Sequence, residues 1–207
     1  FLLFTHYGEG WDIPRLVSEL GLDNNEILCC YKCRESGEFF VAPFVGQDAP
    51  NPRNGNKSLV TVNLGDSLTT EQVNEWYNLL DAFVLPFTSG GQELSVQEAK
   101  LVEIPTLVNS YSCGEDLCKP EAFSLELDFS TYREIGTQFI KASPYPSSIA
   151  KQMKKIYEMP REKRREIGKK AKEWVLNNFS IEVVSKNYEK MIDELPAHNY
   201  DWADQAK

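Results

Sequence analysis

The chain has 207 residues, enough for one ordinary domain or two small ones with a sizeable core. Its 42% hydrophobic and 26% charged residues are typical of a soluble globular protein. No apolar run approaches the roughly 20 residues that a membrane-spanning helix needs, so we predict no such helix. The net charge of −9 argues against nonspecific nucleic-acid binding by the chain as a whole.

The five cysteines are an odd number and fit no regular disulfide framework, which indicates a reducing compartment and a cytoplasmic protein. Cys30 and Cys33 are spaced like the first pair of a zinc ribbon. The second pair, expected roughly 15–20 residues later, is missing. We therefore expect neither a zinc site nor another metal cofactor. Cys113 and Cys118 are interpreted as buried or surface thiols.

Positive charge is concentrated in one segment. Residues 151–172 hold ten Lys or Arg against three Glu, a net charge of +7, which leaves −16 on the remainder. One interpretation is a solvated helix face with internal salt bridges. The other is a patch that contacts an anionic acceptor or a membrane surface.

Short apolar strands and helices alternate along most of the chain. Strands are predicted at 1–5, 26–32, 59–65, 82–87, 106–110 and 123–128, and helices at 10–22, 67–80 and 92–103. Thr69 or Thr70 is the expected N-cap of the second helix. Residues 34–58, rich in Gly, Pro and Asn, are predicted to form a loop. The pattern predicts an α/β fold, a doubly wound parallel sheet with crossover helices.

The end of the chain differs from this alternation. Three consecutive helices are predicted within 147–195, the second entered through Pro160, followed by a polar tail at 197–207.

The stretch from Phe83 to Ala99, "FVLPFTSGGQELSVQEA", carries the most specific signal. In an open parallel sheet, ligands bind beyond the carboxyl ends of the strands. Gly90 and Gly91 lie there, before a helix whose unpaired N–H groups suit a phosphate. Glu98 lies one to two turns into that helix, where its carboxylate can accept both hydroxyls of a ribose. The pattern favours a nucleotide.

The same region resembles the donor-binding half of GT-B glycosyltransferases, specifically the large retaining family 4. That family shows a tyrosine, an aspartate before an apolar strand, a glycine-rich turn, Glu-Ala and Pro before a second strand. The matching positions are Tyr77, Asp81, 83–86, 89–91, Glu98, Ala99 and 105–108. The resemblance extends from Phe1 to about Asp193 and implies a Rossmann-like domain, half of a GT-B fold.

The resemblance also implies roles for individual residues. Glu98 matches the second glutamate of the family's Glu-x7-Glu pair, which binds the ribose. The first would fall at Gly90, so we expect Glu93 to supply that catalytic carboxylate. The donor-binding residues that we expect are Gly90, Gly91, Gln92, Leu94, Glu98, Ser112 and Gly114.

By the resemblance, residues 1–196 form the donor-binding domain, and the amino-terminal acceptor domain is absent from this chain. The function implied is that of a retaining glycosyltransferase that uses a nucleotide-diphosphosugar donor and a glycan or other acceptor. This half alone is expected to be inactive. The alternative is a catalytically inactive module that binds a nucleotide or a partner, which Gly90 favours. A phosphatase or epimerase of similar architecture would need a His or carboxylate set that the sequence does not show.

Overall fold

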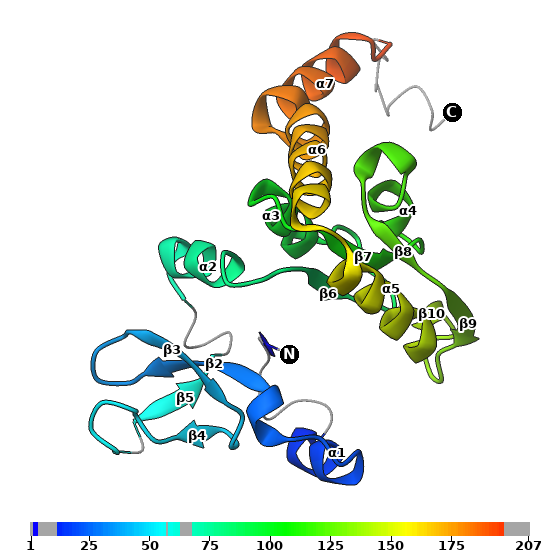
Figure 1. Ribbon diagram of the computed structural model, residues 1–207. Helices are drawn as coiled ribbons and strands as arrows, with labels where there is room; N and C mark the ends of the chain where they lie inside the picture. Colours follow the sequence, from blue (N-terminus) through cyan, green and yellow to red (C-terminus); the bar gives the residue numbers. More distant parts are fainter. Residues whose placement is uncertain (1, 4–11, 57, 63–67, 197–207) are drawn as a thin grey trace, which may run out of the picture. The chain divides into compact units, whose positions relative to one another are not determined.

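The computed structural model describes residues 2–3, 12–56, 58–62 and 68–196 (Figure 1). The predicted polar tail lies outside these ranges. The chain divides into two compact units, Phe1–Leu80 and Asp81–Lys207. None of the helices in the described ranges combines the length and the apolar composition needed to cross a membrane.

The first unit contains a small mixed sheet. Its strands are β1 (Leu2–Leu3), β2 (Leu28–Cys33), β3 (Phe39–Pro43), β4 (Asp48–Ala49) and β5 (Leu59–Thr61). Only the pairing of β1 with β2 is parallel among these; β2 pairs antiparallel with both β3 and β5, and β4 pairs antiparallel with β5. The prediction of a purely parallel sheet is therefore wrong here.

The predicted loop at 34–58 contains two of these strands, which is a second correction. The backbone N–H of Cys33 donates to the carbonyl of Glu38 at 2.8 Å, and Gly37 adopts a φ of +72° in the turn. Glycine reaches this conformation without steric cost, so the chain reverses tightly and β3 returns beside β2. The hairpin contributes Phe44, which packs with Tyr31 and Val17 in the core of the unit.

The two helices predicted for the first unit are present, as α1 (Ile13–Glu19) and α2 (Thr70–Tyr77). The short 3₁₀ turn η1 (Asn24–Glu26) was not predicted. Thr69 is the N-cap of α2: its hydroxyl accepts the Gln72 N–H, and the Gln72 side chain accepts the Thr69 N–H. This reciprocal capping box satisfies two N–H groups that a helix start leaves unpaired.

The second unit is built on a parallel sheet of order β6-β7-β8. Its strands are β6 (Phe83–Leu85), β7 (Thr106–Asn109) and β8 (Leu125–Leu127), all three predicted from their apolar runs. The helix α3 (Leu94–Leu101) crosses from β6 to β7, and the short α4 (Gly114–Leu117) and η2 (Pro120–Ala122) lead from β7 to β8. All four residues of β7 are buried, as expected for a central parallel strand.

A two-stranded antiparallel hairpin follows the parallel sheet. It consists of β9 (Phe129–Arg133) and β10 (Ile140–Pro144) and was not predicted. The Ala142 N–H donates to the Thr88 carbonyl at 2.8 Å, and the Tyr111 hydroxyl donates to the Ile140 carbonyl. The hairpin is thereby joined to the segments that follow β6 and β7.

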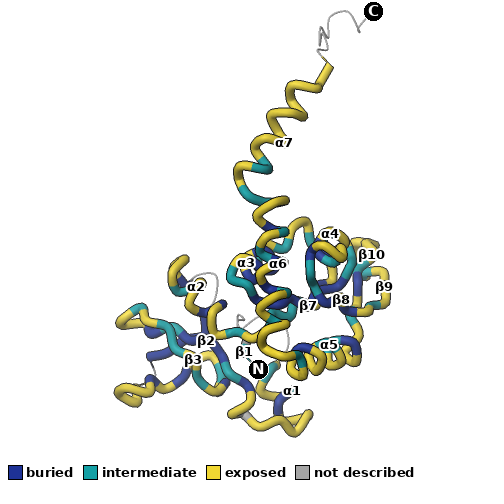
Figure 2. The backbone as a smooth tube through the Cα atoms, turned by 45° about the horizontal axis from the view of Figure 1, so that its top comes forward, coloured by how far each residue is buried: buried dark blue, intermediate teal, exposed yellow. Residues whose placement is uncertain are grey.

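Three helices close the chain, as predicted: α5 (Pro146–Glu158), α6 (Arg161–Phe179) and α7 (Ile181–Asp193). Pro160 is the N-cap of α6. Ile156 of α5 is buried against Leu107 and Leu127 of the sheet. The helix α6 packs on α3, whereas α7 has no buried residue and is exposed along most of its length (Figure 2). The fold is thus mixed α/β, with a parallel three-stranded sheet and small accompanying sheets.

Candidate functional site

The candidate site lies at the carboxyl ends of β6 and β7. These strands are parallel, with Leu85 opposite Val108, so the segments that follow them leave the same edge of the sheet. The first segment runs through Gly90 to the start of α3, and the second runs through Ser112 to α4. Open parallel sheets bind ligands at this edge, which is why the geometry of the two segments decides what the site can do.

A hydrogen bond joins the two segments directly. The Ser112 hydroxyl donates to the Gly90 carbonyl at 2.7 Å. Ser112 has a φ of +56°, the left-handed conformation that residues other than glycine seldom adopt. This turn brings the exposed Ser112 side chain to the first segment. Two of the residues predicted to bind the donor are therefore in contact.

Glu93 folds back onto Gly90. A Cβ atom added at Gly90 would lie 2.0 Å from the Glu93 Oε1 and 3.5 Å from the Cys113 Sγ. The carboxylate of Glu93 therefore occupies the space that a side chain at position 90 would take. Sequence reasoning did not assign Cys113 to this group, because a cysteine in a loop has no pattern of its own.

Cys113 is half-buried, and burial raises the pKa of its thiol, with a further increase from the nearby Glu93 carboxylate. A hydrogen bond from the Glu93 backbone acts in the opposite direction and lowers this pKa. The thiol thus stays protonated at neutral pH, where an S–H group is a weak hydrogen-bond donor.

The start of α3 is open at its N-cap. Glu93 is the N-cap residue, its side chain makes no capping hydrogen bond, and the first turn carries no acidic residue. Gly91 and Gln92 before it are exposed, and Leu94 is 60% exposed. The exposed N-terminal end of this eight-residue helix carries the positive end of its dipole.

Glu98 lies on the exposed face of α3. It follows Leu94 by four residues, so both lie on one side of the helix, while Val96, Ala99 and Lys100 are buried on the other. The carboxylate is therefore on the solvent side of α3, one turn beyond Leu94. The ribose-binding role of Glu98 stays a prediction.

Gly114 has a packing role that the sequence did not indicate. It is buried, and an added Cβ would lie 2.0 Å from the Asn109 carbonyl oxygen and 2.7 Å from the Phe87 ring. Only a glycine lets α4 begin this close to the end of β7. Its burial gives no support to the predicted ligand contact.

Lys100 is a buried cation that sequence reasoning missed. Its side chain is fully buried, and its Nζ donates to the carbonyls of Ala122 at 2.6 Å and Leu117 at 3.3 Å. The Nζ also lies 4.8 Å from the centre of the Trp174 ring. Burial lowers the pKa of Lys100 to about 8. The residue joins α3 to η2 and α6, which is a structural role.

The cysteines of the first unit lie in its interior. Cys30 and Cys33 are buried on β2, and both are free thiols. Within the described ranges, no group of three or more His, Cys, Asp or Glu is arranged to hold a metal ion.

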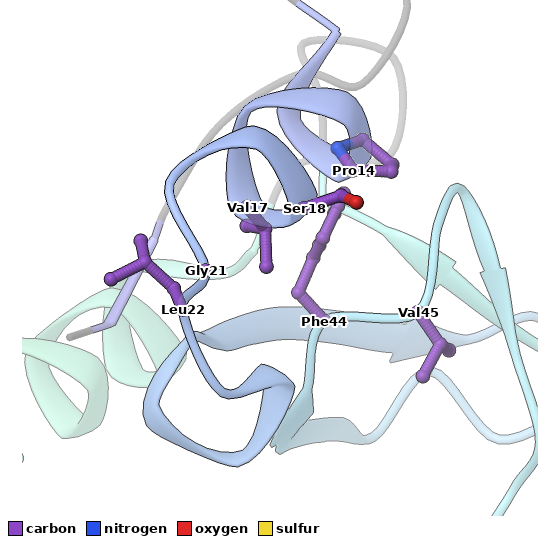
Figure 3. Close-up of a pocket in the computed structure, with 7 residues that line it drawn as sticks. All are labelled: Pro14, Val17, Ser18, Gly21, Leu22, Phe44 and Val45. Carbon is purple, nitrogen blue, oxygen red and sulfur yellow. The ribbon is translucent and has the colours of Figure 1, made fainter.

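A pocket of about 490 Å³ lies in the first unit (Figure 3). The helix α1 supplies one wall, and the segment after β3 supplies the other through Phe44 and Val45. Ser18 contributes a hydroxyl group, whereas the other side chains that line the pocket are apolar. None of the seven residues that line it belongs to the predicted donor site.

The basic segment 151–172 covers most of α5 and the first part of α6. Several of its cations form ion pairs, including Lys154 with Glu158 at 3.7 Å and Lys170 with Glu166 at 2.6 Å. Lys172 pairs with Glu103 of the α3 end at 3.1 Å. These pairs fit the interpretation of a salt-bridged helix face, and contact with an anionic partner stays a prediction.

No family model matches this chain, and no curated protein or solved structure matches it either. The function is therefore inferred from the chemistry of the site.

Proposed function

We propose that this chain is the nucleotide-diphosphosugar-binding half of a retaining glycosyltransferase, with a Rossmann-like donor domain. The observation that carries the proposal is the meeting of two segments at the carboxyl edge of a parallel sheet, where Ser112 bonds to Gly90 at 2.7 Å beside the open start of α3. A sugar nucleotide needs such a place for its diphosphate.

The diphosphate is assigned to the start of α3. The first N–H groups of a helix have no partner within it, and the dipole favours a negative group there. Gly91 and Gln92 are exposed, so a ligand can approach their backbone. An N-cap without a side-chain hydrogen bond supports the assignment, because a capping side chain would compete with the phosphate.

Glu93 is assigned to the transferred sugar. The resemblance places the family's first glutamate at position 90, which is glycine here. The Glu93 carboxylate lies where a side chain of residue 90 would begin. This geometry supports Glu93 as its replacement. A carboxylate there can accept hydrogen bonds from the sugar hydroxyls and stabilise positive charge that develops at the anomeric carbon.

Glu98 is assigned to the ribose. Its exposed carboxylate lies one turn beyond Leu94 on the same side of α3, and a ribose offers two neighbouring hydroxyls that one carboxylate can accept. In the transfer, the bond between the anomeric carbon and the diphosphate breaks and a bond to the acceptor oxygen forms on the same face. The proton of the acceptor hydroxyl passes to the departing diphosphate. The N–H groups of α3 stabilise the departing diphosphate. The acceptor is assigned to a separate domain, as the resemblance implies, so this half alone is expected to be inactive.

A second candidate is an inactive binding module, cytoplasmic like the first. Gly90 in place of a carboxylate is the observation that favours it. Such a module would bind nucleotide through α3 but would not distinguish a sugar nucleotide from the free nucleoside diphosphate, because Glu93 would then have no role.

Calorimetric titration of UDP-, GDP- and ADP-glucose into the full chain tests the proposal. One of these sugar nucleotides should bind, and Glu98→Ala should weaken its binding by about 1–3 kcal/mol, the scale of hydrogen bonds to a charged group. Glu189→Ala, on the exposed face of α7, is the matched control and should bind like the wild type. If none of the sugar nucleotides binds, the proposed function is wrong. Equal affinity in the Glu98→Ala variant would remove Glu98 from the site.

A further inference from the structure

Cys113 and Glu93 come from different segments and meet at one point. A Cβ atom at Gly90 would lie 2.0 Å from the Glu93 Oε1 and 3.5 Å from the Cys113 Sγ, so carboxylate and thiol both border the same small space. The hydrogen bond from Ser112 to Gly90 fixes the distance between the two segments immediately next to this point.

The thiol and the carboxylate are chemically matched. A protonated thiol offers one weak donor and one weak acceptor. The Glu93 backbone donates to Cys113, and the Glu93 carboxylate lies near enough for its charge to raise the pKa of the thiol. In the role proposed below, the thiol in turn donates to this carboxylate. Burial is the main reason that the pKa of the thiol is raised, and the carboxylates of Glu93 and Asp116 raise it further. The S–H form is therefore present when the carboxylate is ionised.

Glu93 needs such support. It is the N-cap residue of α3, but its side chain makes no capping hydrogen bond to the helix. A free glutamate side chain samples several rotamers, and holding it in one of them costs about 1.5–2 kcal/mol of conformational entropy. A partner on the neighbouring segment reduces this loss on ligand binding, because the carboxylate is already placed.

We propose that Cys113 is a positioning residue that holds the Glu93 carboxylate beside Gly90, in the orientation in which it meets the sugar of the donor. The role rests on the proposed function, since it concerns the same site. Cys113 itself does not contact the reacting atoms.

The donor titration tests the consequence for binding. Cys113→Ala removes the hydrogen-bond donor of the thiol and should weaken binding of the sugar nucleotide by about tenfold, the scale of one hydrogen bond to a charged group. Cys113→Ser keeps a donor at nearly the same place and should restore most of the affinity. The affinity for the matching nucleoside diphosphate without sugar should be the same in both variants and the wild type. Circular dichroism of each variant checks that it is folded.

A second measurement needs no ligand. The rate of Cys113 alkylation by iodoacetamide is followed against pH, with the modified peptide quantified by mass spectrometry so that Cys33 is read separately. Hydrogen bonds, first from the Ser36 side chain, lower the pKa of Cys33 to about 7. Glu93→Gln should shift the midpoint for Cys113 to lower pH, because the negative charge that opposes thiolate formation is gone. Asp116→Asn should shift it less, and Glu121→Gln, exposed on η2, should leave it unchanged.

The outcomes separate this role from the proposed function. An unchanged alkylation midpoint of Cys113 in Glu93→Gln overturns the pairing of thiol and carboxylate, whether or not a sugar nucleotide binds. Equal donor affinity in Cys113→Ala and the wild type overturns the positioning role while the proposed function stands. A shifted midpoint without binding of any sugar nucleotide overturns the proposed function and the role together, and leaves only the contact between the two side chains.

Discussion

Replacing Gly168 with alanine gives a sharp test of how α6 packs on α3. A Cβ atom at this position would lie 1.9 Å from the carbonyl oxygen of Glu103 and 2.6 Å from its carbonyl carbon. Ordinary van der Waals contact begins at 3.4 Å, so α6 has to retreat by about 1.5 Å. The obstacle is backbone at the end of α3, which cannot rotate away as a side chain would.

Two effects of opposite sign compete in this variant. Alanine in the interior of an exposed helix is more favourable than glycine by about 0.5–1 kcal/mol. Overpacking of a close contact costs about 1–3 kcal/mol and occasionally more. A clash with backbone belongs to the upper part of that range. We therefore expect Gly168→Ala to lower the free energy of unfolding by about 2 kcal/mol.

Urea unfolding followed by far-UV circular dichroism measures this change. The pair Asn177→Gly and Asn177→Ala, at an exposed position of the same helix, gives the glycine-to-alanine difference without a packing contact. If Gly168→Ala is stabilised by the same amount as that pair indicates, the close approach of α6 to Glu103 is wrong.

Three further changes have defined expectations. Glu103→Gly should raise the free energy of unfolding by about 1 kcal/mol, because Glu103 follows α3 with a φ of +65°, which glycine adopts more easily. The half-exposed ion pair with Lys172 that is lost contributes little. A lower free energy of unfolding, measured by urea denaturation, would contradict this. Lys100→Met should remove a pH dependence of the stability. The pKa of Lys100 in the folded protein, about 8, lies below the ordinary 10.5, so between these values the unfolded chain binds more protons than the folded one. The free energy of unfolding of the wild type therefore rises with pH through this window. Unfolding curves at both ends of the window compare the two proteins, and an equal gain in Lys100→Met would refute the burial of a charged lysine. Thr69→Ala should lose about 1 kcal/mol through the capping box of α2, and unchanged thermal unfolding would show that the cap is not formed.

Local signals predicted the helices and the parallel strands well. Thr69 with Gln72 three residues later marked the start of α2, and Pro160 marked the start of α6. The apolar runs of β6, β7 and β8 were recognised because parallel strands buried on both faces lack polar alternation.

The hairpins were missed for different reasons. Between β2 and β3, Gly37 separates two apolar runs by a short turn, a hairpin signal that the surrounding Gly, Pro and Asn concealed. In β9 four of the five residues are exposed, and in β10 a single residue is buried, so these strands show little hydrophobic pattern. Their pairing depends on tertiary contacts, such as the Ala142 bond to Thr88, which no local window contains.

The candidate site was predicted in part. Gly90, Glu93 and Ser112 were expected at one sheet edge, and they lie together there. Cys113 and Lys100 were not expected, since the partners that define their surroundings come from distant parts of the chain. The burial of Gly114 follows from the approach of α4 to β7, a distance that no sequence pattern encodes.

Hydrogen exchange of the full chain, with and without millimolar sugar nucleotide, tests the central claim most directly. A donor whose phosphates bind at the start of α3 should slow exchange in peptides covering 88–98 and 110–114, and leave α7 unchanged. Protection confined to the first unit, or to the basic segment 151–172, would contradict the placement of the donor at this edge of the sheet.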